Sequence, residues 1–131
     1  FIRQQQRMNK NQKGCFAEYH FSTTAMQNGF NVSIPLLDSS PYDCILEKNG
    51  KLFKVQVKYL GKQRYRHGRS VQVTLKREGT KSYDLQLVDF FALWHEVRNG
   101  FYIIKNLGQK SFKITDNGIY EKNFNNFVAL V

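Results

Sequence analysis

The sequence has few of the residues that stabilise or anchor a protein by special means. It contains only two cysteines, Cys15 and Cys44, which are far apart and have no second Cys or His at metal-ligand spacing. This argues against a zinc site, and we expect both thiols to stay reduced. The apolar segments are short and interrupted by charge, so they support neither a membrane span nor a signal peptide. We therefore expect a soluble, cytoplasmic protein with no membrane partner.

Acidic residues are also scarce. Lys and Arg number 20 against 10 Asp and Glu, which gives a formal net charge of +10 and a sequence pI near 9.8. From Lys51 to Lys81 the chain has ten Lys or Arg residues and one acid, Glu78. Half of the positive charge thus lies in less than a quarter of the chain. A concentration of this kind predicts a polyanionic partner, and nucleic acid is the leading candidate.

The length of 131 residues fits one domain with a conventional hydrophobic core. Residues 1–7 precede Met8, and we expect them to be a disordered tail, or a segment placed ahead of the natural start, outside the fold. Residues 8–131 are expected to form a single domain, because the chain has no internal repeat and no segment with the composition of a linker.

A helix is predicted over residues 12–28, which lack Pro and close at Asn28-Gly29. Within this helix four residues recur at spacings of three and four, which predicts an apolar stripe along one face. Glu18 lies next to this stripe, displaced from it by the rotation of about one residue. The members of this stripe are Phe16, Tyr19, Thr23 and Met26.

Strands are predicted where apolar residues alternate or run together between turn residues. Pro35 ends the first of them and opens a turn-rich loop over 36–41. Asn99-Gly100 closes the turn of a hairpin between the last two. The predicted strands cover residues 30–34, 42–48, 51–59, 71–75, 87–94 and 101–104.

The segment 42–59 is predicted to fold back on Asn49-Gly50 as a two-residue type I′ hairpin. Counting outward from this turn, Lys48 pairs with Lys51. Successive side chains point to opposite faces of the hairpin. One face is apolar and comprises Cys44, Leu46, Phe53, Val55 and Val57. The other face carries Asp43 opposite Gln56, with Lys58 diagonal to Asp43.

Four polar residues form the candidate site: Glu18, Asp43, Gln56 and Lys58. Each of them alone is explained most simply as an ordinary surface residue. Together they supply hard oxygen ligands for a metal ion and a cation for developing negative charge. Magnesium-dependent cleavage of a phosphodiester bond requires both.

The motifs Pro41-Tyr42-Asp43 and Gln56-Val57-Lys58, with Glu18 on a helix that begins at Lys13-Gly14, resemble the PD-(D/E)XK nuclease superfamily. Within it, they are similar to homing endonucleases encoded by group I introns of cyanobacterial transfer RNA genes. The resemblance covers roughly residues 13–106. It implies an α/β (α+β) fold with a restriction-endonuclease-like core, in which helices flank a central mixed sheet.

The resemblance also implies the roles of the site residues. Glu18, Asp43 and the Gln56 amide oxygen would hold one or two Mg²⁺ ions, with the Val57 carbonyl as a further ligand. Lys58 would position the attacking water or stabilise the transition state. Gln56 departs from the superfamily pattern, because a second carboxylate usually stands at this position.

We therefore expect a site-specific DNA endonuclease that makes a double-strand break and acts in intron homing. Two alternatives are a non-catalytic DNA-binding module, which the neutral Gln56 keeps open, and a Holliday junction resolvase of the same superfamily. The basic segment, residues 61–70, and the strand after it contain seven residues that are expected to contact DNA, through base edges or through phosphate. They are Lys62, Arg64, Arg66, His67, Arg69, Gln72 and Lys76.

A double-strand break needs two active sites. The resemblance thus implies a homo-oligomer on double-stranded DNA with a pseudo-palindromic site, as a tetramer in preference to a dimer. The apolar tail over residues 124–131 either forms part of such an interface or docks onto the core of its own chain.

Overall fold

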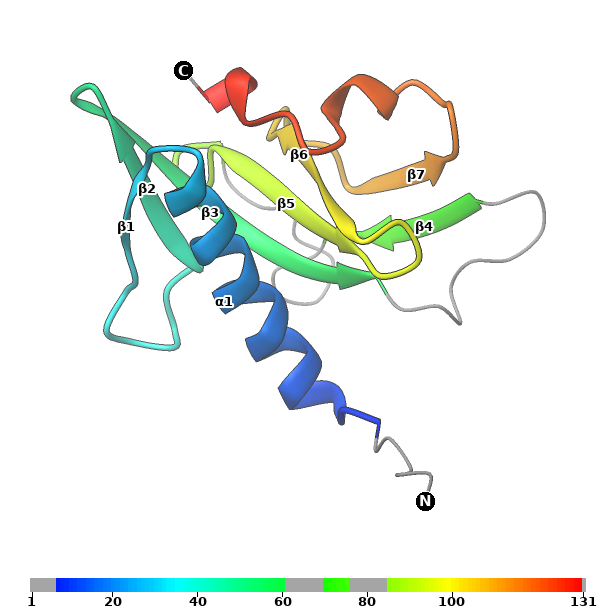
Figure 1. The fold of residues 1–131 in the computed structure, drawn as a ribbon, viewed down its shortest axis with the longest axis horizontal. Coiled ribbons are helices and arrows are strands. Elements are labelled where there is room, and N and C mark those ends of the chain that lie inside the picture. Colours follow the sequence, from blue (N-terminus) through cyan, green and yellow to red (C-terminus); the bar gives the residue numbers. More distant parts are fainter. Residues whose placement is uncertain (1–6, 61–69, 76–84, 131) are drawn as a thin grey trace.

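The computed structural model describes residues 7–60, 70–75 and 85–130. These residues form two sheets, one α-helix and short 3₁₀ helices, and Figure 1 shows their arrangement. The helices are α1 (Lys10–Gln27), η2 (Glu121–Asn123) and η3 (Phe127–Leu130). The strands are β1 (Asn31–Ser33), β2 (Cys44–Lys48), β3 (Lys51–Leu60), β4 (Ser70–Thr74), β5 (Phe90–His95), β6 (Gly100–Lys105) and β7 (Ser111–Thr115).

The main sheet is mixed, as predicted. It has five strands in the order β1-β2-β3-β5-β6, in which β3 and β5 are parallel and the other neighbours are antiparallel. The strands β4 and β7 form a separate antiparallel pair. All of the predicted strands are present in the described residues, and the β5–β6 hairpin turns at Asn99, whose φ is +57°.

The β2–β3 hairpin confirms the predicted register. Asn49 and Gly50 have φ values of +54° and +79°, and a positive φ at both central residues is what a type I′ turn requires. Lys48 pairs with Lys51, and Cys44 pairs with Val55. The short Asn-Gly turn therefore sets which side chains of β3 face the core.

The helix α1 begins two residues earlier than predicted, at a capping box. The Asn9 side chain accepts a hydrogen bond from the Gln12 amide, and the Gln12 side chain accepts one from the Asn9 amide. The helix ends at Gln27 with Asn28 as its C-cap, one residue before the predicted end, and Gly29 follows with a φ of +88°.

The predicted apolar stripe on α1 is wrong. Phe16, Tyr19 and Met26 are 40%, 60% and 54% exposed. The buried side of the helix is lined by smaller residues and one aromatic ring: Ala17, Phe21, Ser22 and Ala25. Small side chains let the helix lie close to the sheet. The spacing of the large apolar residues therefore predicted the wrong buried face of the helix.

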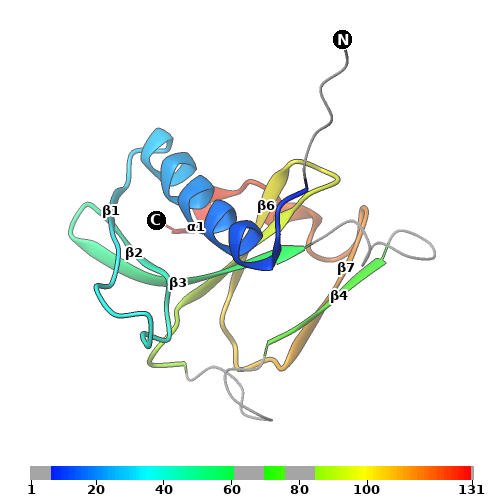
Figure 2. The ribbon, with the colours of Figure 1, turned by 90° about the horizontal axis from the view of Figure 1, so that it is seen from below.

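The main sheet is covered on both faces. On one face α1 and the C-terminal residues enclose a core that includes Phe21, Val57 and Trp94. On the other face β4 and β7 enclose a second core that includes Phe91 and Phe112. Figure 2 shows α1 and the β4–β7 pair on opposite sides of the sheet. Alternate residues of β3 thus face different environments.

The C-terminal tail docks onto its own chain, which was one of the two predicted alternatives. Phe127 and Leu130 are buried in the core beneath α1. The Asn125 side chain accepts a hydrogen bond from the Phe101 amide. Close packing requires Gly100, since a Cβ there would lie 2.3 Å from the Phe124 ring. In the described part of the chain, no helix is long and apolar enough to span a membrane.

Candidate active site

Asp43 lies just before β2 and is held by β3. Its amide donates a hydrogen bond of 2.8 Å to the Val55 carbonyl. Its Oδ2 accepts a hydrogen bond of 2.7 Å from the Val57 amide. These partners are the two neighbours of Gln56, so the half-buried Asp43 lies opposite Gln56 at the open end of the hairpin. The carboxylate is therefore oriented by backbone groups of a core strand.

Glu18 comes to the same point from the middle of α1. It follows the buried Ala17, which places it at the margin between the helix and the sheet. Its carboxyl group hydrogen-bonds to that of Asp43. Burial, followed by the negative charge of Asp43, raises the pKa of Glu18 from 4.5 to about 7, and Asp38 adds to the rise.

The two carboxyl groups titrate as a pair. Burial also raises the pKa of Asp43, and the Val57 amide, the hydrogen bond from Glu18 and the Lys58 ammonium act in the opposite direction. The pKa values of both carboxyl groups are thus raised, because burial outweighs the favourable partners of Asp43. Such a rise is expected where two acids lie together without enough positive charge.

Lys58 and Gln56 lie on the same face of β3. Val55 and Val57, which alternate with them, are buried in the core beneath α1. The Lys58 ammonium is close enough to Asp43 to lower the pKa of that carboxyl group. Gln56 is half-buried and is paired in register with Phe91 of β5. The structure therefore brings Glu18, Asp43 and Lys58 together and places Gln56 on the strand between them.

A pocket of roughly 290 Å³ opens at the two carboxyl groups. Its other wall is the loop between β1 and β2, which contributes Ile34, Pro35, Leu37, Asp38, Ser40 and Tyr42. Sequence reasoning placed neither Asp38 nor Tyr42 in the site. The one sequence feature that could have indicated Asp38 was its position in the loop just before Pro41. Loop residues have no periodicity, so the sequence does not show which way their side chains point.

The residues at this pocket fit a hard divalent cation. The carboxyl groups of Glu18 and Asp43 lie against each other, and the negative charge of Asp43 raises the pKa of Glu18. A divalent cation between them would offset this repulsion. Within the described ranges, no group of three or more His, Cys, Asp and Glu residues is arranged so that it could hold a metal ion. The described lining of the pocket therefore offers the paired carboxylates of Glu18 and Asp43 with Asp38 nearby, and Gln56 does not line it.

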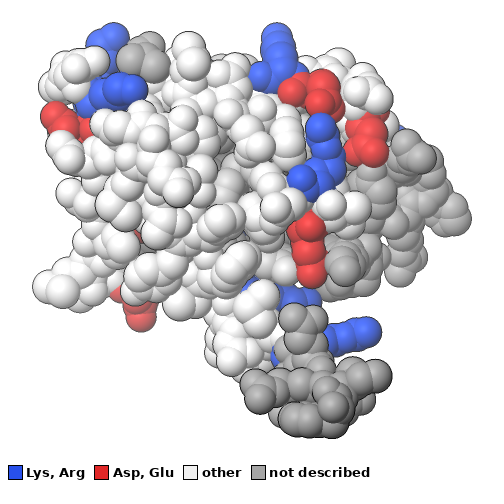
Figure 3. Space-filling model, in the orientation of Figure 1, with Lys and Arg blue, Asp and Glu red and all other residues white. Residues whose placement is uncertain are grey.

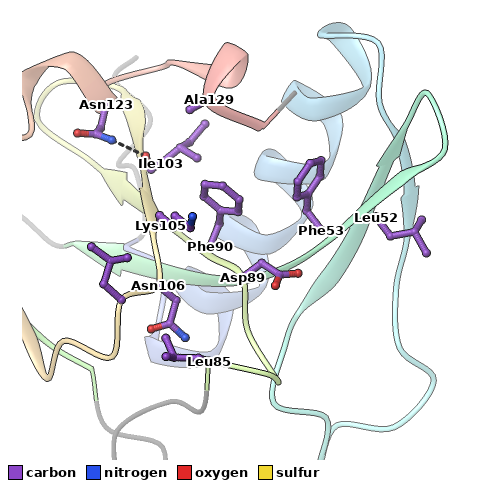
Figure 4. Close-up of a pocket in the computed structure, with 11 residues that line it drawn as sticks. Leu52, Phe53, Leu85, Asp89, Phe90, Ile103, Lys105, Asn106, Asn123 and Ala129 are labelled. Carbon is purple, nitrogen blue, oxygen red and sulfur yellow. Dashed lines mark hydrogen bonds between the residues drawn. The ribbon is translucent and has the colours of Figure 1, made fainter.

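A larger pocket of about 760 Å³ lies at the other end of β3 (Figure 4). Its single acid, Asp89, accepts a hydrogen bond of 2.8 Å from the Lys54 amide. Apolar side chains such as Phe53, Phe90 and Ile103 form much of the remaining wall. Among the described residues that line this pocket there is one acid, which already has a backbone partner, so they do not supply the paired acids needed for metal chemistry.

Most of the predicted DNA-contacting residues lie outside the described residues: Lys62, Arg64, Arg66, His67, Arg69 and Lys76. Gln72 is described and lies exposed on β4, opposite Lys113 of β7. In Figure 3 the Lys and Arg side chains on the face covered by α1 lie near its edges, and a broad uncharged area separates them. The charge of the described residues on this face does not define a phosphate-binding surface.

Comparison with known families gives the context for this geometry. Residues 8–128 match the model of the PD-(D/E)XK endonuclease family. The chain belongs to this family. A comparison with curated protein sequences gave no match. The family match covers α1, the whole main sheet and the 290 Å³ pocket.

Two solved structures share the fold. A bacterial homing endonuclease has a TM-score of 0.80 and 21% sequence identity, over 94% of this chain and 93% of its own. Hjc, a Holliday junction resolvase from the archaeal hyperthermophile Archaeoglobus fulgidus, has a TM-score of 0.56 and 12% identity, over 90% of this chain and 94% of its own. The PD-(D/E)XK nuclease fold predicted from sequence is thereby confirmed.

Proposed function

We propose that this PD-(D/E)XK protein is a site-specific DNA endonuclease that uses Mg²⁺ to hydrolyse phosphodiester bonds and makes a double-strand break in intron homing. The observation that carries the proposal is the pair Glu18 and Asp43, whose carboxyl groups lie against each other in an open pocket near Lys58. Strained ionisable groups that converge in a pocket are characteristic of catalytic sites.

The chain's own residues would prepare the site as follows. The Val57 amide orients Asp43 through its Oδ2, so this acid keeps its position without a bound ligand. Lys58 presents a compact ammonium beside the carboxylates, where it positions the attacking water or stabilises the charge that develops on the phosphate.

The metal-binding residues in this proposal are Glu18, Asp43, the Gln56 amide oxygen and the Val57 carbonyl. When bound, Mg²⁺ would polarise the phosphate and make a water molecule more acidic. Gln56 contributes an oxygen without charge, which leaves the site one carboxylate short of the usual family pattern and predicts weaker metal affinity.

DNA binding is assigned to the basic segment and to β4. The residues are Lys62, Arg64, Arg66, His67, Arg69, Gln72 and Lys76. Replacing Arg64, Arg66 and Arg69 by Ala should lower the slope of log affinity against log salt by about 0.9 for each phosphate that the variant no longer neutralises. An unchanged slope would place the phosphate-binding residues elsewhere on the protein.

Assembly follows from the chemistry of the break. One copy of this chain offers one carboxylate pocket of the kind described, and cutting both strands at a defined site needs two. We assign the protein a homo-oligomer, as a tetramer in preference to a dimer, on a pseudo-palindromic duplex. Sedimentation equilibrium with and without DNA measures this directly, and a monomer under both conditions would contradict it.

Two other functions remain as candidates because specific observations favour them. The fold shared with the archaeal Hjc favours a junction resolvase. The neutral Gln56 favours a DNA-binding module without activity. The former predicts cleavage by shape, and the latter predicts the same basic surface without any metal dependence.

A cleavage assay separates these functions. The protein is incubated with Mg²⁺ and, in parallel, with a duplex that carries an intronless transfer RNA gene, a random duplex and a four-way junction. Cleavage of the first substrate alone supports homing, and preference for the junction supports a resolvase. Binding without cleavage of any substrate, at any Mg²⁺ concentration, would overturn the nuclease assignment. Asp43→Asn serves as the control for contaminating nucleases.

A further inference from the structure

The loop between β1 and β2 exposes an unusual run of apolar side chains. Ile34, Leu36 and Leu37 are 56%, 97% and 69% exposed. A single exposed leucine is ordinary on a protein surface, but three large aliphatic residues within four positions form a patch. Such a patch indicates a contact with another molecule.

The patch lies beside the two carboxyl groups. Ile34 and Leu37 line the same pocket as Glu18 and Asp43. A phosphodiester group that reaches these acids therefore lies against this loop. In Figure 1 the loop runs from β1 to β2 at the edge of the molecule, away from the C-terminal end.

The loop is held in shape from both sides. Both prolines of the chain, Pro35 and Pro41, bracket the five residues between them. The Ser40 amide donates to the Leu37 carbonyl at 3.3 Å, which closes a turn within the loop. The flanking strands are paired, with Val32 opposite Leu46. A braced loop of this kind keeps its leucines extended toward solvent, since proline removes backbone freedom.

The chemistry of the loop does not suit a phosphate contact. Residues 34–41 contain no Lys or Arg, and they include the acid Asp38. Apart from Asp38 and the small Ser39 and Ser40, the side chains that this loop can offer to nucleic acid are apolar. The apolar part of a duplex is the stacked interior of a base step, which leucine side chains reach by insertion from the groove.

We propose that Leu36 and Leu37 form a wedge that enters the duplex between base pairs next to the bond to be cut. The insertion unstacks one base step and unwinds the DNA locally, which brings the phosphate toward Glu18 and Asp43. This inference rests on the proposed function, because it takes double-stranded DNA as the ligand.

The test measures unwinding of closed circular DNA and needs no knowledge of the target sequence. A relaxed plasmid is incubated with the protein and a metal-independent type I topoisomerase in EDTA, where metal-dependent cleavage is absent. After removal of protein, the linking number is read from the topoisomer distribution. Binding is measured in the same buffer, so that variants are compared at equal amounts of bound protein.

The informative variant carries Leu36→Ala and Leu37→Ala. The matched control is Val128→Ala, which removes an aliphatic side chain that is 78% exposed on η3. The parent and the control should lower the linking number equally, and the double variant should lose most of this change at equal occupancy. Circular dichroism melts should be alike for all three proteins, because the substituted side chains are exposed.

Four results would overturn the wedge. The first is a double variant that changes the linking number as much as the parent does. The second is a double variant with an altered oligomeric state, which would assign the leucines to a contact between copies. If the parent binds DNA without changing the linking number, the wedge fails and the nuclease proposal stands. If the parent does not bind the plasmid at any protein concentration, the proposed function fails and the wedge fails with it.

Discussion

Two pairs of charged side chains in this protein differ in what surrounds them. Arg98 donates hydrogen bonds of 2.8 and 2.9 Å to both carboxylate oxygens of Glu121, and a third of 2.7 Å to the Tyr102 hydroxyl. Glu18, in contrast, lies against a second acid, Asp43. The hydrogen bond from Arg98 lowers the pKa of Glu121, whereas burial and Asp43 raise that of Glu18 to about 7.

One chain thus uses charge for two purposes. The Arg98–Glu121 pair joins the β5–β6 turn to η2, and every charge in it has a partner of opposite sign. It holds the C-terminal segment in place. At Glu18 and Asp43 the negative charge is incompletely balanced, which costs stability in the free protein and suits a site that binds a cation. Substitutions at the two pairs should therefore have different consequences.

The largest expected effect is that of Asp43→Asn on cleavage. We expect the rate in Mg²⁺ to fall by about 1000-fold or more, because the amide removes a metal ligand and its charge. DNA affinity should change little. The measurement is single-turnover cleavage of a supercoiled plasmid.

Asp89→Asn is the matched control for this substitution. Asp89 also precedes a strand and also accepts a hydrogen bond from a β3 amide, that of Lys54. The substituted protein should cleave like the parent. Equal losses for the two variants would mean that the Asp43 effect is structural.

Arg98→Ala should act on stability and leave the chemistry intact. The variant loses the partner of Glu121 and a guanidinium that lies 3.9 Å from the centre of the Phe124 ring. We expect the melting temperature to fall by only a few degrees, since an ion pair that is partly open to solvent contributes little to stability. Cleavage well below the melting temperature should match that of the parent.

Lys58→Ala should show the opposite pattern. The cleavage rate of the variant should fall by roughly 100-fold or more, because it lacks the ammonium that would stabilise the negative charge developing on the phosphate. Its melting temperature should change little. If Arg98→Ala and Lys58→Ala each lost both stability and activity, the distinction between the Arg98–Glu121 pair and the carboxylate site would be wrong.

Glu18→Gln should change how stability depends on pH. A carboxyl group whose folded pKa is raised above its unfolded value binds its proton more tightly in the folded state, so folding stability falls as pH rises through the window between the two. For Glu18 this window runs from about 4.5 to about 7.

The measurement is a series of thermal melts across this window in EDTA. The parent should lose more stability between pH 5 and pH 7.5 than the Gln variant does. Saturating Mg²⁺ should reduce the difference between the two proteins, because a cation replaces the proton. Parallel curves in EDTA would mean that Glu18 titrates as an ordinary surface acid.

The smallest expected effect is that of Gln56→Glu. A carboxylate at this position would add repulsion to Asp43, so the variant should melt below the parent in EDTA. It should also gain more stability from Mg²⁺, since a ligand that binds the folded state stabilises it according to its affinity. A Mg²⁺-induced rise no larger than that of the parent would remove Gln56 from the metal site.

The β2–β3 hairpin illustrates what could be predicted from sequence. Asn49-Gly50 is a local signal, and the register from Lys48 to Cys44 follows from it by counting. The same counting placed Asp43, Gln56 and Lys58 on one side of the strand. Nearby residues in a hairpin are coupled through the turn, so a single dipeptide determines a large part of the site.

The helix shows where such reasoning failed. The large residues Phe16, Tyr19 and Met26 have helical spacing but are exposed, while Ala17 and Ala25 are buried. Helical periodicity defines faces without saying which face lies against the sheet. That choice depends on the space available between α1 and the strands, which small residues fill without steric conflict.

The sequence by itself determined the local elements, the family motifs and the concentration of positive charge, because each depends on residues that are close along the chain. Only the tertiary structure decided how burial and charge act on the predicted pair of Glu18 and Asp43, that Asp38 adds to their charge, and that Ile34 and Leu37 of the β1–β2 loop line the same pocket. These contacts join a helix, a loop and a hairpin. Their pKa shifts arise from burial and from charges brought together by packing, and no pattern along the chain contains that information.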